Sequence, residues 1–124
     1  MATSTQEYPA LAANAAIAAE HARDIAAQHL PSRAEDAYRL VQALMVCALT
    51  STGDGDTVKL ITEASSLTGV RFEVHYTPLH LLYSPIGGAW EVVSTVADAY
   101  GDRPTKNSDY GRLIYGDLRT CRDT

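Results

Sequence analysis

The sequence is short of basic residues, cysteines and long hydrophobic runs. Only two of its 124 residues are lysine, and ten basic residues against fifteen acidic ones give a net charge of −5. Nucleic-acid binding depends mainly on basic side chains, so this balance argues against a nucleic-acid partner. The two cysteines, Cys47 and Cys121, are too few for a disulfide framework. The longest apolar run, Ala43 to Leu49, is far shorter than the ~20 residues that span a bilayer. We therefore expect a cytoplasmic chain with no membrane segment and no signal peptide.

Alanine is abundant in the chain, with 19 copies. Alanine has the highest intrinsic helix propensity and allows helices to approach closely. Its abundance beside so little lysine is typical of a high-GC bacterial genome. Residues 1–7 are polar and are expected to form a flexible leader. The remaining residues, 8–124, are expected to form a single helical domain.

Two helices are predicted in the first half of the chain. The first covers about residues 9–30, where Ile17, His21 and Ile25 repeat at helical spacing and Pro31 follows. The second covers residues 33–50 and follows Ser32 to Glu35, which has the pattern of a capping box. Its second half, Leu40 to Leu49, is apolar on nearly every side, so we expect other helices to enclose it.

The apolar period changes to two between Val70 and Tyr76, which predicts one half-buried strand. This strand needs a partner, for which residues 79–83, residues 112–115 and a second subunit are all candidates. Helices are predicted over 57–68, with Asp56 as its N-cap, over 84–101 and over 108–121. The expected fold is mainly α: a compact bundle of four to five helices around the central helix 33–50, with one short strand or hairpin near 70–83.

No motif in the sequence specifies a reaction. The sharpest candidate site is a cleft near the only tryptophan, with Glu91 or His80 as its general base. Its predicted lining residues are Trp90, Tyr83, His80, Glu91 and Tyr110. Glu73, His75 and His80 do not have a recognised metal-binding spacing, so we expect neither a metal nor a cofactor.

The absence of a catalytic motif and the unpaired strand favour a regulatory or protein-interaction module over an enzyme. Tyrosine and tryptophan are enriched at protein interfaces, and most of them lie in the second half of the chain. We expect a homo-oligomer or a protein partner, with Phe72 and Tyr76 at the interface. The alternative is a small-molecule-binding domain or a small enzyme that uses the cleft near Trp90, His80 and Glu91.

Overall fold

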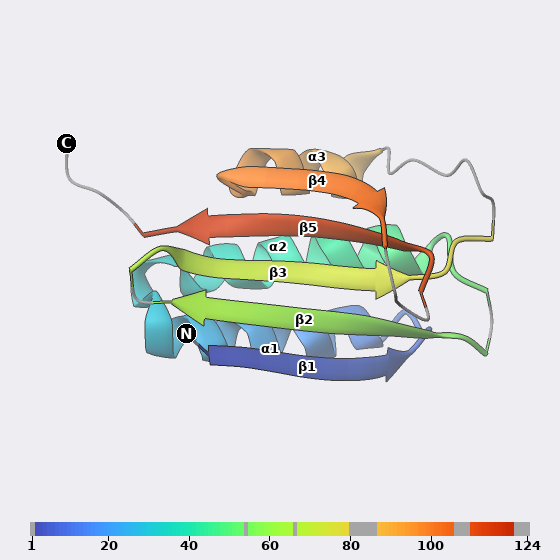
Figure 1. The fold of residues 1–124 in the computed structure, drawn as a ribbon, viewed down its shortest axis with the longest axis horizontal. Coiled ribbons are helices and arrows are strands. Elements are labelled where there is room, and N and C mark those ends of the chain that lie inside the picture. The colour runs from blue at the N-terminus through green and yellow to red at the C-terminus, as the bar shows by residue number, and fades with distance from the viewer. Residues whose placement is uncertain (1, 54, 66, 80–86, 106–109, 121–124) are drawn as a thin grey trace.

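The protein is a five-stranded antiparallel sheet with three α-helices on one of its faces, as the computed structural model shows (Figure 1). The structure describes residues 2–53, 55–65, 67–79, 87–105 and 110–120. Its elements follow in the order β1 Ala2–Pro9, α1 Asn14–His29, α2 Ala34–Leu49, β2 Thr57–Ser65, β3 Gly69–Tyr76, α3 Gly88–Val96, β4 Ala99–Pro104 and β5 Arg112–Arg119, with a short 3-10 turn, Pro31–Arg33, between the first two helices.

The strand order is β1-β2-β3-β5-β4, so β3 is central and β1 and β4 form the two edges. Every neighbouring pair is antiparallel. The face without helices is called the open face below. Three rows of side chains cross it from β1 to β4: Glu7, Lys59, His75, Leu113 and Arg103; Thr5, Ile61, Glu73, Tyr115 and Gly101; and Thr3, Glu63, Arg71, Asp117 and Ala99.

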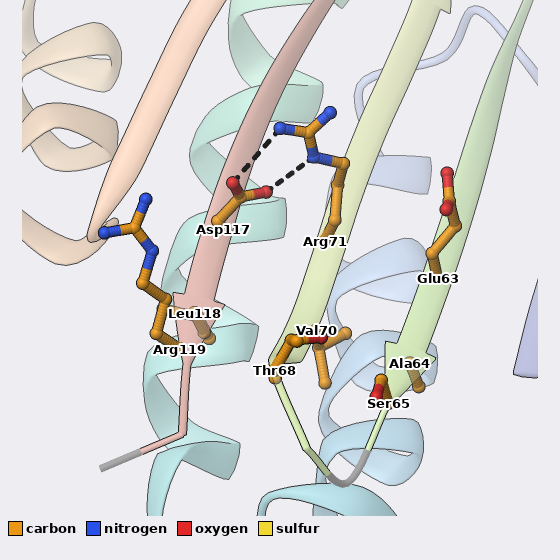
Figure 2. A pocket seen from close by; sticks show the side chains of 10 residues that line it. Glu63, Ala64, Ser65, Thr68, Val70, Arg71, Asp117, Leu118 and Arg119 are labelled. Atoms are coloured by element: carbon orange, nitrogen blue, oxygen red, sulfur yellow. Dashed lines mark hydrogen bonds and ion pairs between the residues drawn. The ribbon is translucent and has the colours of Figure 1, made fainter. Parts of the chain in front are cut away.

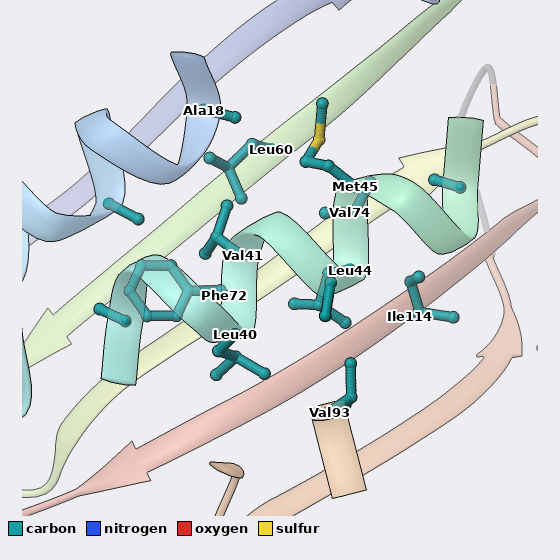
Figure 3. Packing of buried hydrophobic residues seen from close by; sticks show 14 of the residues in the cluster. Ala18, Leu40, Val41, Leu44, Met45, Leu60, Phe72, Val74, Val93 and Ile114 are labelled. Atoms are coloured by element: carbon teal, nitrogen blue, oxygen red, sulfur yellow. The ribbon is translucent and has the colours of Figure 1, made fainter. Parts of the chain in front are cut away.

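The core lies between the sheet and the helices, with α2 at its centre (Figure 3). Leu40 and Leu44 of α2 are fully buried, as are Phe72 and Val74 of β3. Gly116 of β5 makes room for this packing, because an added Cβ there would lie 2.7 Å from Cδ1 of Leu40. Helices α1 and α3 cover the two sides of α2.

The predicted helical bundle is wrong, because the sheet supplies one whole layer of the structure. Helix α2 matches the predicted helix 33–50 and lies in the middle of the helix layer, but other helices do not enclose it. The sheet packs against one side, while Gln42 and Val46 reach solvent on another. A sheet with one apolar face buries an apolar helix as well as a ring of helices would.

Five local predictions are also wrong. Residues 57–68 and 108–121, expected as helices, contain β2 and β5, and residues 2–7, expected as a leader, lie in β1. The capping box does not form, because α2 begins at Ala34 with no side-chain cap at Arg33. The helix predicted over 84–101 is shorter, since α3 ends at Val96 and Tyr100 lies in β4.

The strand predicted at 70–76 is confirmed as β3, and its partners lie within the chain. Of the three candidates, residues 112–115 are part of β5, which pairs with β3 along one side. The other partner, β2, was predicted as a helix. No segment from a second subunit is needed to satisfy the backbone of β3.

Candidate functional site

The two edges of the sheet differ in length and in charge. β1 has eight residues, mostly exposed, and its one charged residue is Glu7. β4 has six residues and carries the charged pair Asp102 and Arg103. An edge strand presents unpaired N–H and C=O groups, and natural proteins commonly protect such edges by shortness and by charge. β4 has both protections, whereas β1 has almost none. Within the described residues, the outer side of β1 pairs with no other strand.

Hydrogen bonds to three of its residues hold β1 in place. Tyr110 donates its hydroxyl hydrogen to Oε2 of Glu7, at 3.1 Å. Asn14, at the start of α1, donates from Nδ2 to the carbonyl oxygen of Pro9, at 2.8 Å. In the first half of the strand, Ser4 Oγ and His21 Nε2 lie 3.4 Å apart. The edge is therefore anchored on its inner side while its outer side stays open.

Helix α1 lies behind β2 on the helix side of the sheet (Figure 1), and its His21 reaches the edge strand at Ser4. Ile17 of α1 is 53% exposed, and several other large apolar side chains among the described residues are exposed too, including Leu11 and Leu67. It precedes His21 by one helical turn, so both side chains lie on the side of α1 nearest to β1. Arg23, on the opposite side, contacts Tyr38 and Glu35 of α2.

The open face carries a network of charges that neutralise one another. Arg71 donates from Nε and Nη2 to the two carboxylate oxygens of Asp117, at 2.7 and 3.1 Å. Its Nη1 lies 3.7 Å from Glu73, which accepts a hydrogen bond from Nε2 of His75 at 3.0 Å. The hydrogen bond from His75 is the main cause that lowers the pKa of Glu73, and the charges of Arg71 and Arg103 add to it. These contacts link β3 and β5 across the middle of the open face.

Tyr115 lies at the centre of the same network. The guanidinium carbon of Arg71 is 4.4 Å from the centre of the Tyr115 ring, and that of Arg103 is 5.2 Å away. Such cation–π contacts stabilise a stacked arrangement. The ring lies close over Gly101, where an added Cβ would come within 2.6 Å of it. β4 and β5 are thereby joined by side chains as well as by backbone.

A pocket of about 280 Å³ opens at the end of the sheet where β2 turns into β3 (Figure 2). It is lined by Glu63, Ala64, Ser65, Thr68, Gly69, Val70, Arg71, Asp117, Leu118 and Arg119. Its central charged groups, Arg71 and Asp117, are paired with each other, as the dashed lines in Figure 2 show. The hydrogen-bonding capacity of Arg71 and Asp117 is therefore largely used within the protein.

A second hollow lies between α2 and α3, with a volume of about 270 Å³. Its lining is mostly apolar and consists of Arg39, Gln42, Ala43, Val46, Gly88, Ala89 and Val92. Val46 is 37% exposed there. The first turn of α3 forms one end of this groove, and Gly87 before it adopts a positive φ of 97° that suits glycine.

The structure does not bring the predicted cleft residues together. Trp90 packs edge-to-face on Tyr100 of β4, with ring centres 5.7 Å apart, and Glu91 is exposed beside it. Tyr110 instead contacts β1 and β2, at the opposite edge of the sheet, through Glu7 and Thr57. His80 and Tyr83 lie outside the described residues. The metal-binding set considered above, Glu73, His75 and His80, therefore lies partly outside them as well.

The two predicted interface residues, Phe72 and Tyr76, are fully buried between the sheet and the helices, so a partner cannot reach them in this fold. Sequence reasoning missed the edge strand β1. The signal for β1 was its content of Thr3, Thr5 and Tyr8, residue types that favour strands.

Comparison with known proteins adds no family. No family model matches the chain, and no curated protein matches its sequence. No helix in the described part of the chain is long and apolar enough to cross a membrane. Across the same ranges, no three His, Cys, Asp or Glu side chains gather as metal ligands would.

Proposed function

We propose that this chain is a cytoplasmic, non-catalytic protein-interaction module that binds an extended protein segment along β1. The observation that carries the proposal is the contrast between the two sheet edges: β4 is short and charged, and β1 is long, exposed and nearly uncharged. Strand addition to a free edge is a common mode of protein recognition, in which backbone hydrogen bonds supply affinity and alternate side chains supply specificity.

The rest of the fold supports this role, because it holds the edge rigid. Glu7, Ser4 and Pro9 are each bonded inward, so β1 is ordered before a partner arrives. Because β1 is already ordered, only the partner strand loses conformational entropy on binding, and the entropic cost is lower. The open face is a network of paired charges in which Arg71, Glu73 and Asp117 stabilise the sheet.

A capture experiment tests the proposal. The chain is immobilised and exposed to an extract of its source cells, and bound proteins are identified for the wild type and for Thr5→Lys. Lysine on an edge strand opposes strand addition, so we expect Thr5→Lys to lose the specific partner. Thr95→Lys is the matched control, since Thr95 is exposed on α3, and it should retain the partner. A partner that both variants retain would refute binding at β1.

The groove between α2 and α3 favours a second candidate function, the binding of a small molecule. An apolar lining with Arg39 at its side suits a ligand that has an apolar body and an anionic group. The free N–H groups of the first turn of α3 would add to the attraction for the anion. A thermal-shift screen of anionic metabolites tests this, with Val46→Trp as the variant that fills the groove. A ligand that stabilises both proteins equally does not bind there.

A further inference from the structure

We propose that the pocket where β2 turns into β3 binds a free amino acid, with the carboxylate of Glu63 holding its ammonium group and the guanidinium of Arg119 holding its carboxylate (Figure 2). This inference goes beyond the proposed function, because no residue of β1 lines the pocket. The site lies on the open face, at the start of β3.

The hollow exists because a glycine lies where the open face would otherwise carry a side chain. Ser65, Gly69 and Arg119 are paired across β2, β3 and β5, so they form one more row of this face. Gly69 has a positive φ of 114°, and an added Cβ would clash with the carbonyl oxygen of Leu118. The space above it measures about 280 Å³. Ligand pockets usually have about 300–1,000 Å³, so only a small molecule fits this one.

The middle of the pocket wall carries no net charge. Arg71 donates two hydrogen bonds to the carboxylate of Asp117, and the two charges neutralise each other. This pair therefore favours neither a cation nor an anion. The choice of ligand depends on the charged groups of the lining that have no such partner.

Two charged side chains of the lining are unpaired, and their charges are opposite. Glu63 is half-buried on β2 and Arg119 is exposed at the end of β5. Neither side chain forms a hydrogen bond or an ion pair within the described residues. The charge of Arg119 also acts on Asp98, but Asp98 is already paired with Arg33. One free carboxylate and one free guanidinium around a small hollow suit a zwitterion.

The spacing of these two groups suits a zwitterion of the size of an amino acid. β2 and β5 lie on either side of β3, and the pairing places Glu63 and Arg119 two residues apart along the strands. Their Cα atoms are therefore about 12 Å apart. Figure 2 shows the two side chains on opposite sides of the pair that Arg71 and Asp117 form. Their reach leaves a gap of a few ångströms, and an α-amino acid joins its ammonium and carboxylate groups through a single carbon atom.

Hydroxyl groups at the turn complete the site. Ser65 and Thr68 both line the pocket. Ser65 Oγ accepts a hydrogen bond from the backbone N–H of Leu67, at 3.2 Å, so its own hydrogen remains available to the ligand carboxylate. Hydrogen bonds to charged groups are about twice as strong as neutral ones, so Glu63 and Arg119 should supply most of the affinity.

NMR titration of the full, isotope-labelled chain with each of the protein amino acids tests the inference. At least one amino acid should bind with saturation and shift the amide signals of Thr68 and Gly69. Its N-acetyl derivative lacks the ammonium group and its amide lacks the carboxylate, so each should bind roughly tenfold more weakly or worse. Glu63→Gln and Arg119→Gln should weaken binding of the unmodified amino acid by a similar factor. Circular dichroism verifies that both variants remain folded.

The derivatives also assign each ligand group to its residue. Glu63→Gln should not weaken binding of the N-acetyl derivative further, because the group that Glu63 holds is already absent. Arg119→Gln should likewise leave binding of the amide unchanged. Glu20→Gln, exposed on α1, and Arg39→Gln, in the groove between α2 and α3, are the matched controls and should bind as the wild type does.

Three results would overturn the inference. The first is that no amino acid binds with saturation. The second is that the N-acetyl derivative and the amide bind as tightly as the amino acid itself. The third is that Arg39→Gln loses binding while Arg119→Gln keeps it, which would place the ligand in the groove between the helices.

Discussion

The contact between Gly116 of β5 and Leu40 of α2 allows the packing of the helix layer on the sheet to be tested quantitatively. A Cβ at Gly116 would lie 2.7, 3.0 and 3.2 Å from Cδ1, Cδ2 and Cγ of Leu40. Carbon atoms in favourable contact are about 3.5–4.0 Å apart. Leu40 is fully buried, so it cannot swing into solvent to relieve the clash.

The expected cost of Gly116→Ala follows from two opposing effects. Overpacking a core costs about 1–3 kcal/mol. Replacing glycine by alanine lowers the entropy of the unfolded chain and recovers about 0.4–1 kcal/mol. We therefore expect the variant to lose about 1–2 kcal/mol of unfolding free energy, measured by urea denaturation and circular dichroism.

A double-mutant cycle makes the test specific to this contact. Leu40→Ala alone should cost about 2–5 kcal/mol, because it leaves a cavity. In that background the methyl group of Gly116→Ala fills part of the cavity and should be neutral or stabilising, which gives a coupling energy of about 1–3 kcal/mol. Gly111→Ala is the matched control, since its Cβ would meet Pro78 at an ordinary 3.8 Å, and it should raise stability slightly, by about 0.4–1 kcal/mol. Equal effects of Gly116→Ala in both backgrounds would refute the packing of α2 on β5.

Three further predictions concern charges and a thiol. The pKa of Glu73 is lowered in the folded protein, so its ionised carboxylate stabilises the fold fully above the ordinary pKa of 4.5. This contribution is lost as the pH falls through the lower pKa of the folded state. The unfolding free energy of Glu73→Gln should therefore vary less with pH in that range than that of the wild type. Arg33 donates to Asp36, Asp98 and the carbonyl oxygen of Val96, so Arg33→Ala should lose about 1–3 kcal/mol in urea denaturation, and Arg33→Lys should recover only part of it. Burial raises the pKa of Cys47 to about 11, so peptide mapping after treatment with iodoacetamide at mildly alkaline pH should find it unmodified in the native protein and alkylated in urea.

Each of these three predictions can be contradicted by a specific result. Parallel pH profiles for the wild type and Glu73→Gln would mean that the bond from His75 does not hold the carboxylate ionised. If Arg33→Lys fully restored the unfolding free energy, the positive charge alone, and not the hydrogen-bonding geometry of the guanidinium, would account for the stabilisation. Native alkylation of Cys47 would place this thiol in contact with solvent, against its 3% exposure.

The helices and one strand could be predicted from the sequence because their periods are clear. Helix α2 has apolar residues on most of its sides, and β3 alternates cleanly from Val70 to Tyr76. β2 was mistaken for a helix because Val58, Ile61 and Ala64 fit a helical period as well as Val58, Leu60 and Ala64 fit a strand. The β-branched residues of β2 were the signal that favoured a strand.

β5 and β1 were harder for different reasons. In β5 both Leu113 and Ile114 are buried, on opposite faces, so the alternation that marks a half-buried strand is lost. β1 buries little of its surface, and its register comes from pairing with β2, which a local pattern does not reveal. The candidate edge was missed with it, because an edge exists only once the order of the strands is known.

Hydrogen exchange at the two sheet edges is the most direct test of the claim that β1 is the binding edge. Amide exchange is measured on the wild type alone and with the protein that the wild type captures and Thr5→Lys does not. Exchange in Ala2–Pro9 should slow markedly when that protein is added, while exchange in Ala99–Pro104 stays the same. Rates in Ala2–Pro9 that do not change on its addition, or that change equally at both edges, would contradict the claim.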